Sequence, residues 1–337
     1  MNLERAAPPS RIVLAGDVGG TKTLLGLFEC GASRPRPLLV RSYPTTAFGS
    51  FTDMLDAFAG DAGHPLRVAA AAIGAAGPVI GRRVRLTNVG WDLDADEIAS
   101  RLGIRLAVLL NDLTAMAHSA DLLAPEEMVT LQAGTRRADG NGVVIAAGTG
   151  LGQAYLHRVD GRLCPLASEG GHADFAPRTD REIDLLRMLR RERGRVEVED
   201  VLSGPGLLNV HRFTHGSSAC PALDRAAPDA QAAAVSAAAM AGSCGACVEA
   251  LAMFVGVFGA EAGNLAVRGV ATAGVYVGGG IAPRILPLLH GPLFIEAFRD
   301  RGPMSQLARN MPVTVMINAE AGLLGAAVYA QTVLDGV

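Results

Sequence analysis

The sequence is poor in lysine, in aromatic residues and in cysteine. Lys22 is the only lysine among 30 basic residues, and aromatic residues make up 4% of the 337-residue chain. Acidic residues outnumber basic ones for a net charge of −3, and no basic block is interleaved with aromatics. A nucleic-acid partner is therefore not expected. The arginine bias is interpreted as a coding preference.

Long apolar runs and a secretory leader are also missing. The stretch from 250 to 260 is bounded by Glu249 and Glu261, and it is too short to cross a bilayer. The first nine residues lack the apolar core of a signal peptide. We therefore expect no membrane segment and a cytoplasmic protein.

The cysteines are few and odd in number, which argues against a disulfide framework and favours reduced thiols. They are Cys30, Cys164, Cys220, Cys244 and Cys247. Cys244 and Cys247 form a C-x-x-C in an alanine-rich stretch, where the sequence shows neither a second cysteine pair nor a nearby histidine. Helix packing is therefore favoured there over a metal or redox role.

Glycine is abundant, and it clusters between apolar runs. "LAGDVGGTKTLLGL" (14 to 27) fits neither the Walker A nor the Rossmann spacing, and the run after its glycines indicates a strand. "VVIAAGTGLGQAYL" (143 to 156) repeats the order of strand, glycine turn and strand. Laying residues 16 to 21 against 147 to 152 indicates an internal duplication. A third cluster, "VYVGGGIAP" (275 to 283), closes another strand and leads into a helix from Pro283.

The glycine turns are candidates for binding a polyphosphate. Backbone N–H groups in such turns converge on phosphate oxygens, and the hydroxyls of Thr21 and Thr149 add donors. One turn alone would equally be a plain hairpin, whereas two matched turns and a third cluster favour a nucleotide. Asp17, in the first turn, suits Mg²⁺ bound through water; the alternative is a turn aspartate bonded to its own backbone.

Polar residues at strand ends and bends are the candidates for chemistry. Asn111 and Asp112 end the apolar strand of "RLAVLLND", where α/β folds place ligand groups, although either could simply cap the next helix. In "SEGGHADFAP" (168 to 177), Glu169 and His172 flank a Gly-Gly turn that lets both side chains project the same way. Glu199 adds a carboxylate before "DVLSGPGL".

The remaining segments indicate how the chain is organised. Residues 217 to 231 are interpreted as a surface loop, followed by a long helix over about 232 to 266 with a possible break between 256 and 263. The last helix carries Gly322, Gly325 and Ala326 on one small-residue face, which would let it pack onto the first domain. Two duplicated halves suggest a two-lobed α/β fold with a cleft.

These motifs together resemble those of bacterial ATP-dependent glucokinases, in the actin/hexokinase/Hsp70 ATPase superfamily. The resemblance runs from about residue 11 to about 330 and rests on "GDVGGTKT", "LLNDLTAMAH", "AAGTGLGQA", "SEGGHADFAP", "EDVLSGPGL", "VGGGIAPR" and "AGLLGAA". It implies a duplicated ribonuclease H-like fold with a cleft between a small domain (10 to 122 plus 318 to 337) and a large domain (123 to 317). It also suggests a homodimer.

The resemblance implies a role for each matching residue. Asp112 is the expected general base for the 6-hydroxyl of D-glucose, and the expected sugar ligands are Asn111, Asp112, Glu169, His172 and Glu199. The ATP phosphates are expected on Gly16, Asp17, Val18, Gly19, Gly20 and Thr21 and on Gly148, Thr149 and Gly150, with Gly279 near the adenosine and Mg²⁺ held by Asp17 through water. Thr87 and Asn88, in "RLTNVGW", are weaker candidates for closing the sugar pocket.

Other functions stay open at this point. The repressor/ORF/kinase family shares the first turn but carries a cysteine-rich zinc motif after its sugar-binding histidine, and no cysteine follows His172 here until Cys220. A kinase for mannose, fructose or glucosamine is the main alternative. A non-catalytic sugar sensor and a sugar-independent ATPase fit less well, because they leave Asp112 or the Glu/His cluster without a role.

Overall fold

The computed structural model describes residues 11–63, 66–86, 89–216 and 218–336. Its chain divides into two compact units, which are described separately. Unit 1 comprises Met1–Leu123 and Asn318–Val337, and unit 2 comprises Ala124–Ile317. Thr87 and Asn88 lie outside the described residues.

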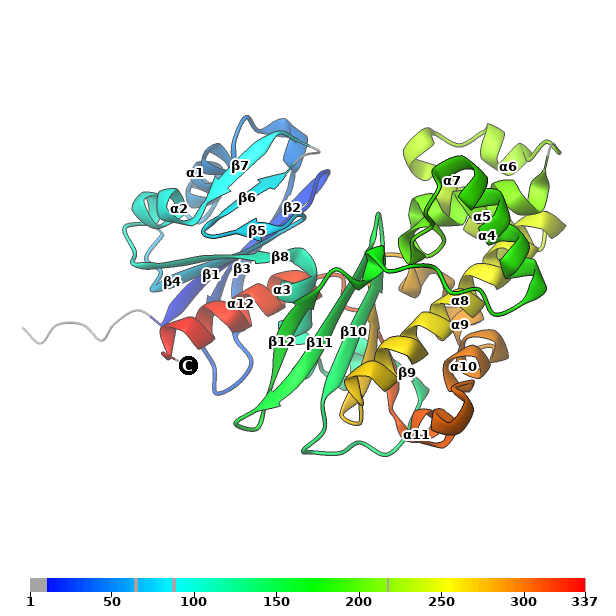
Figure 1. Cartoon of the computed structure of the whole chain (residues 1–337). Coiled ribbons are helices and arrows are strands. Elements are labelled where there is room, and N and C mark those ends of the chain that lie inside the picture. The colour runs from blue at the N-terminus through cyan, green and yellow to red at the C-terminus, as the bar shows by residue number, and fades with distance from the viewer. Residues whose placement is uncertain (1–10, 64–65, 87–88, 217, 337) are drawn as a thin grey trace, which may run out of the picture. The chain divides into compact units, whose positions relative to one another are not determined.

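Unit 1 is built on a five-stranded mixed sheet in the order β3-β2-β1-β4-β8 (Figure 1). Its first three strands form an antiparallel meander, and β4 and β8 run parallel to β1. The central strands are almost entirely apolar, as expected for strands that helices cover on both faces of the sheet. The strands are β1 (Ile12–Val18), β2 (Lys22–Glu29), β3 (Arg36–Pro44), β4 (Ala70–Ala75) and β8 (Leu106–Asn111).

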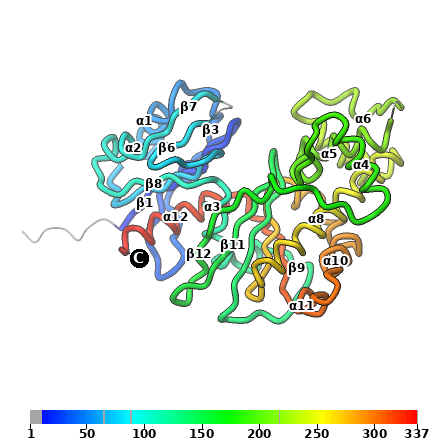
Figure 2. The backbone as a smooth tube through the Cα atoms, viewed as in Figure 1, coloured from blue at the N-terminus to red at the C-terminus, as the bar shows by residue number. Residues whose placement is uncertain are grey.

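Helices cover both faces of this sheet. Phe51, Met54 and Phe58 of α1 (Phe51–Asp61) pack with Leu14 and Ile73 of the sheet in one core. α12 (Ala321–Leu334) packs against β1, β4 and α3 (Asp112–Ser119) (Figure 2). The expected close approach of α12 is confirmed, because a Cβ on Gly325 would overlap the carbonyl oxygen of Ala115 in α3.

A small antiparallel sheet completes unit 1. It consists of β5 (Val79–Ile80), β6 (Arg83–Leu86) and β7 (Trp91–Asp94). The side chain of Asp94 accepts a hydrogen bond from the backbone N–H of Asp96, so it caps the following helix α2 (Ala95–Leu102).

Unit 2 repeats this strand order and adds one strand. Its sheet runs β12-β11-β10-β13-β14-β9, with an antiparallel meander joined to two parallel strands, and β9 pairs antiparallel at the far edge. The matching order supports the predicted duplication. The strands are β9 (Met128–Gln132), β10 (Gly142–Ala147), β11 (Leu151–Val159), β12 (Arg162–Ser168), β13 (Gly274–Gly278) and β14 (Val313–Met316).

The helices of unit 2 gather around α8 (Gly245–Gly269). α8 is long and apolar enough to span a membrane, yet 72% of its most apolar window is buried within the structure, as in a core helix. Its neighbours include α5, α7 and α10. The other helices are α4 (Asp180–Arg193), α5 (Gly204–His215), α6 (Pro221–Asp224), α7 (Gln231–Met240), α9 (Leu286–Leu289), α10 (Pro292–Arg299) and α11 (Ser305–Asn310).

The predicted break in the long helix is in the wrong place. The chain leaves the helix between Met240 and Gly245, where Gly242 takes a left-handed conformation with a φ of 64°. Gly259 and Gly263 lie inside α8 one turn apart, and side chains there would meet the backbone of Phe294 and Phe298 in α10. These glycines therefore admit a neighbouring helix rather than interrupt their own.

Two further expectations need correction. The segment from 218 to 231 is not a plain loop, since it contains α6 and a 3₁₀ turn at Pro228–Ala230. The two hairpins also correspond residue for residue in another register than the sequence alignment, which matched Gly16 with Ala147. The first hairpin turns at residues 19 to 21 and the second at 148 to 150, so Ala147 corresponds to Val18. Matching glycines misaligned them because the turns carry their glycines at different positions.

Candidate active site

The first glycine turn lies between two strands, as predicted. β1 ends at Val18 and β2 begins at Lys22, and the backbone N–H of Gly19 donates to the carbonyl of Lys22 at 3.1 Å. Thr45 braces this turn, because its hydroxyl donates to the carbonyl of Gly19 at 2.8 Å. Thr45 was not among the predicted residues, since nothing in its sequence neighbourhood marks it.

Asp17 precedes this turn, and its surroundings disfavour the charged form of its carboxyl group. Burial raises its pKa to about 6, the charge of Asp112 adds to the rise, and Lys22 opposes it. The first turn of α12 lies against the carboxylate, because a Cβ on Gly322 would come within 2.6 Å of its Oδ2 atom. A carboxyl group with this pKa gains from a cation or a proton at neutral pH.

Asn111 and Asp112 lie at the same sheet edge as Asp17, because β1, β4 and β8 are parallel and end together. Asn111 is the N-cap of α3, and its Oδ1 accepts from the N–H groups of Leu113 and Thr114 at 3.0 and 3.3 Å. Its Nδ2 donates to the carbonyl of Gly77 at 3.3 Å. The capping role considered from sequence is therefore present.

Asp112 opens α3 with its carboxylate held by the same helix. Its Oδ1 accepts a 2.8 Å hydrogen bond from the N–H of Leu113. This contact fixes the side chain at the end of β8, near enough to Asp17 for the two charges to interact. Unit 1 thus brings two carboxylates to the edge that carries the first glycine turn.

The second glycine turn, Gly148 to Gly150, joins β10 to β11 as predicted. Glu199 lies against it, since its carboxylate accepts a 2.7 Å hydrogen bond from the N–H of Leu151. The N-terminus of α5 is attached to the same turn, because the N–H of Gly204 donates to the carbonyl of Gly148 at 2.8 Å. Unit 2 therefore places a carboxylate beside its own candidate phosphate turn.

The third glycine cluster lies at this edge as well. Gly278 pairs with Ala146 in the parallel ladder of β13 and β10. The N–H of Ile281 donates to the carbonyl of Ala147 at 3.2 Å, and Gly279 has a left-handed φ of 86°. The chain then enters a 3₁₀ turn at Ala282–Ile285 and α9, so the helical segment expected around Pro283 is present.

Glu169 and His172 flank a tight bend, as the Gly-Gly pair predicted. Residues Gly170–His172 form a 3₁₀ turn in which the N–H of His172 donates to the carbonyl of Glu169 at 3.0 Å. A Cβ on Gly171 would overlap the carbonyl oxygen of Leu151. Only glycine lets the bend lie this close to β11.

His172 pairs with Glu197, a residue that was not predicted from the sequence. The His172 Nδ1 atom lies 2.7 Å from Glu197 Oε2, and this hydrogen bond raises the pKa of His172; the charges of Glu199 and Glu169 act in the same direction. Arg195 holds Glu197 at 3.1 Å and donates to the carbonyl of His172 at 2.8 Å. The sequence feature that could have indicated Glu197 is the pair of glutamates, 197 and 199, on either side of Val198.

The expectation that no histidine lies near the C-x-x-C is wrong. The Nε2 atom of His215, at the end of α5, lies 3.2 Å from the sulfur of Cys244. The two residues are far apart in sequence, and packing of α5 on α8 brings them together.

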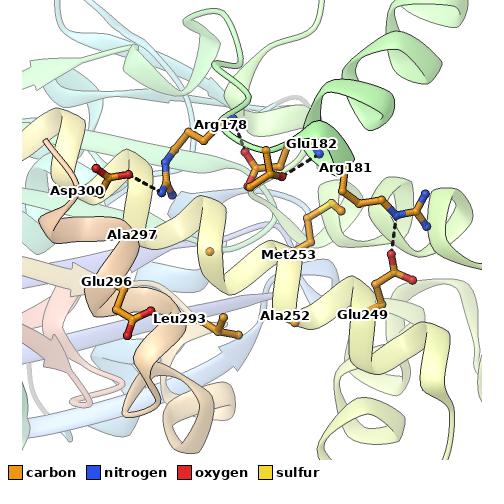
Figure 3. A pocket seen from close by; sticks show the side chains of 12 residues that line it. Arg178, Arg181, Glu182, Glu249, Ala252, Met253, Leu293, Glu296, Ala297 and Asp300 are labelled. Carbon is orange, nitrogen blue, oxygen red and sulfur yellow. Dashed lines mark hydrogen bonds and ion pairs between the residues drawn. The ribbon is translucent and has the colours of Figure 1, made fainter. Parts of the chain in front are cut away.

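One surface cavity is separate from all predicted site residues. It has a volume of about 540 Å³ and lies along α4, α8 and α10 of unit 2 (Figure 3). Ion pairs between Arg181 and Glu249 and between Arg178 and Asp300 lie among its lining residues. Its walls carry no catalytic constellation of the kind found at the sheet edges, so it does not enter the site.

Comparison with known proteins gives the family of this chain. A protein-family model described as glucokinase matches residues 14–333. A glucokinase from Synechocystis is 39% identical, with 94% of this chain and 97% of that protein covered, and one from Nostoc is 36% identical over 95% and 98%. The crystal structure of a glucokinase from an Antarctic psychrotroph is 31% identical, covers 96% of this chain and 99% of its own, and gives a TM-score of 0.84.

More distant structures share the fold. A glucokinase from Streptomyces griseus of the ROK family, solved with glucose and AMPPNP, has a TM-score of 0.63 at 22% identity, covering 95% of this chain and 99% of that one. The duplicated sheets with glycine turns define the actin-like sugar-kinase class. Within that class, the chain belongs to the glucokinase family. It is an ATP-dependent glucose phosphotransferase.

Proposed function

We propose that the chain transfers the γ-phosphoryl group of ATP to the 6-hydroxyl of D-glucose with Asp112 as the general base. The observation that carries this proposal is the placement of Asp112 at the carboxyl edge of the unit 1 sheet, beside Asp17 and the first glycine turn. Phosphoryl transfer needs positioning and charge neutralisation more than covalent chemistry from the protein. A fixed carboxylate next to a phosphate turn meets the need for positioning, whereas the N–H groups of the turn and a bound cation would neutralise the phosphate charge.

In this proposal the backbone of Gly19, Gly20 and Thr21 binds phosphate oxygens, with Gly16, Asp17 and Val18 forming the approach to the turn. Gly148, Thr149 and Gly150 form the second phosphate turn, and Gly279 lies near the adenosine. Support comes from the hairpin geometry of both turns and from the adjacency of the third cluster to the second.

The sugar ligands in this proposal are Asn111, Asp112, Glu169, His172 and Glu199. His172 with a raised pKa suits donation to a sugar hydroxyl, and carboxylates suit acceptance from one. Asn111 would contact the sugar through its Nδ2 group, because its Oδ1 atom caps α3.

The residues around Asp17 fit a magnesium ion. A buried carboxyl with a pKa of about 6, close to a second carboxylate, is a hard oxygen donor that gains from a divalent charge. When bound with ATP, Mg²⁺ would neutralise phosphate charge there, with Asp17 holding it through a water molecule. Asp112 takes the proton of the sugar hydroxyl, and the glycine turns hold the phosphates.

The test is a coupled assay of ADP release with and without glucose, on wild type, Asp112→Ala and Asp112→Asn. A general base contributes about 10²–10⁴-fold, so both variants should lose kcat by that order while calorimetry still detects glucose binding. Asp229→Asn, at an exposed position, is the matched control and should keep wild-type activity. A near-normal kcat in the Asp112 variants would refute the base assignment, and ADP release without sugar would indicate an ATPase.

The finer identity of the substrate and the assembly belong to the same proposal. Glucose is proposed as the preferred hexose over mannose, fructose and glucosamine, and a panel of kcat/KM values decides this. We place the chain in the branch without the cysteine-rich motif after the sugar-binding histidine, because no cysteine lies between His172 and Cys220. A cytoplasmic homodimer is proposed from the family, and light scattering of the purified protein measures its mass in solution.

A further inference from the structure

Four side chains with metal-ligating atoms meet in the interior of unit 2, away from the residues proposed for catalysis. They are His211 and His215 on α5, Cys220 just before α6 and Cys247 in the first turn of α8. One ligand atom from each lies within 4.8 Å of all the others, and the four side chains are buried, with exposures of 8% or less. Three separate elements of the fold supply this His/Cys cluster.

The sulfur atoms have the separation that a shared metal requires. The sulfurs of Cys220 and Cys247 are 3.7 Å apart. A disulfide needs about 2.0 Å. Two thiolates on a tetrahedral zinc ion, each with a Zn–S bond of about 2.3 Å, lie about 3.8 Å apart. The observed spacing, which is also that of a thiol–thiol hydrogen bond, excludes a disulfide and leaves the two sulfurs at the distance that a shared metal ion needs.

The histidines are arranged as ligands rather than as ordinary core residues. His215 Nδ1 lies 3.2 Å from the carbonyl oxygen of His211, so this nitrogen donates and the lone pair remains on Nε2. The buried Nε2 atom of His211 has no hydrogen-bond partner among the described residues. An unsatisfied buried polar atom is costly, and ligation of a cation would remove that cost.

We propose that His211, His215, Cys220 and Cys247 bind a zinc ion in a tetrahedral structural site. Two imidazoles and two thiolates are a ligand set typical of zinc, and two thiolates with Zn²⁺ form a neutral group that a buried site tolerates. A cavity of about 310 Å³ is lined by His211, His215 and Cys220, which gives the ion a route of entry. Cys244, 3.2 Å from His215, lies beside the site as a further thiol.

The zinc site would hold the C-terminal end of α5 in place. The C-terminal end of this helix carries both histidines, and zinc would fasten it to the start of α8. The N-terminal end touches the second glycine turn, where Gly204 donates to Gly148 and the Ser203 hydroxyl donates to the carbonyl of Glu199 at 2.7 Å. Loss of the metal should therefore lower the stability of unit 2 and raise KM more than it lowers kcat.

The experiment uses untagged full-length protein purified without chelators. Mass spectrometry of the metal content should find about one zinc ion per chain. Replacement with cobalt should give the visible bands of tetrahedral Co²⁺ and a thiolate charge-transfer band. The Cys247→Ser and His211→Asn variants should each contain less than about a tenth of that zinc. The matched control is Cys164→Ser, at an exposed cysteine of β12, and it should keep the ion.

A chelator tests the structural role. The metal-binding isomer 1,10-phenanthroline should lower the thermal midpoint of wild type, while 1,7-phenanthroline, which does not chelate, should leave it unchanged. Protein that contains no zinc and takes up no cobalt would overturn the proposal. So would full zinc content in Cys247→Ser, or a mass showing a Cys220–Cys247 disulfide. The cobalt spectrum of wild type decides the matter even if the variants do not fold. A zinc-free but fully active enzyme would refute only this site and leave the proposed function standing.

Discussion

Replacing Asp17 with asparagine should stabilise the ligand-free protein at neutral pH while impairing catalysis. The folded state raises the pKa of this carboxyl from 3.8 to about 6, chiefly by burial and then by the charge of Asp112. The native state therefore binds the proton more tightly than the unfolded chain, and stability falls as the pH rises from about 4 through 6. At about 1.4 kcal/mol per pKa unit, ionised Asp17 costs up to about 3 kcal/mol at pH 7.

The assay is denaturant unfolding of both proteins between pH 4 and 8 without magnesium or nucleotide. The free energy of unfolding of Asp17→Asn should equal that of wild type at the acid end and exceed it by up to about 3 kcal/mol above pH 6. The control is Asp92→Asn, whose side chain is 69% exposed in β7 and should follow the wild-type curve. Magnesium with ATP should stabilise wild type more than Asp17→Asn, because the variant lacks the carboxylate. Parallel pH curves for wild type and Asp17→Asn would refute the reasoning.

Two further predictions concern the bend at 170 to 172. Gly171→Ala should raise KM for glucose and cost about 1–3 kcal/mol of stability, because its Cβ would overlap the Leu151 carbonyl; unchanged KM and unfolding midpoint would contradict the steric argument. Glu197→Gln should lower the pKa of His172, because it removes the charge that stabilises the imidazolium. An NMR titration of the imidazole measures this shift, and a pKa equal to that of wild type would show that Glu197 does not act on it.

Much of the site was predictable because its signals are local. A glycine turn between two apolar runs indicates a hairpin wherever it occurs, and both hairpins turn at glycines that the sequence singled out. The end of an apolar strand is likewise a local feature, so Asn111 and Asp112 were expected at a sheet edge, where they lie. The Gly-Gly pair at 170 and 171 predicted the bend at that position in the same way.

Residues that act through distant partners escaped prediction. Thr45 reaches the first turn across 26 residues, and Glu197 reaches His172 across 25. The glycines of α8 were taken for a break because their function, admitting α10, depends on a helix more than 30 residues later. Spacing along the chain carries no information about such contacts.

The sequence by itself determined the strand order of each hairpin, the glycine turns and the strand-end carboxylates, since each depends on backbone preference and side-chain pattern over a few residues. The tertiary structure decided the chemical state of these groups. The pKa of Asp17 depends on burial beneath α12 and on the charge of Asp112. The His/Cys cluster exists only because α5 packs on α8. Desolvation and charge coupling depend on distances through space, and folding alone sets those.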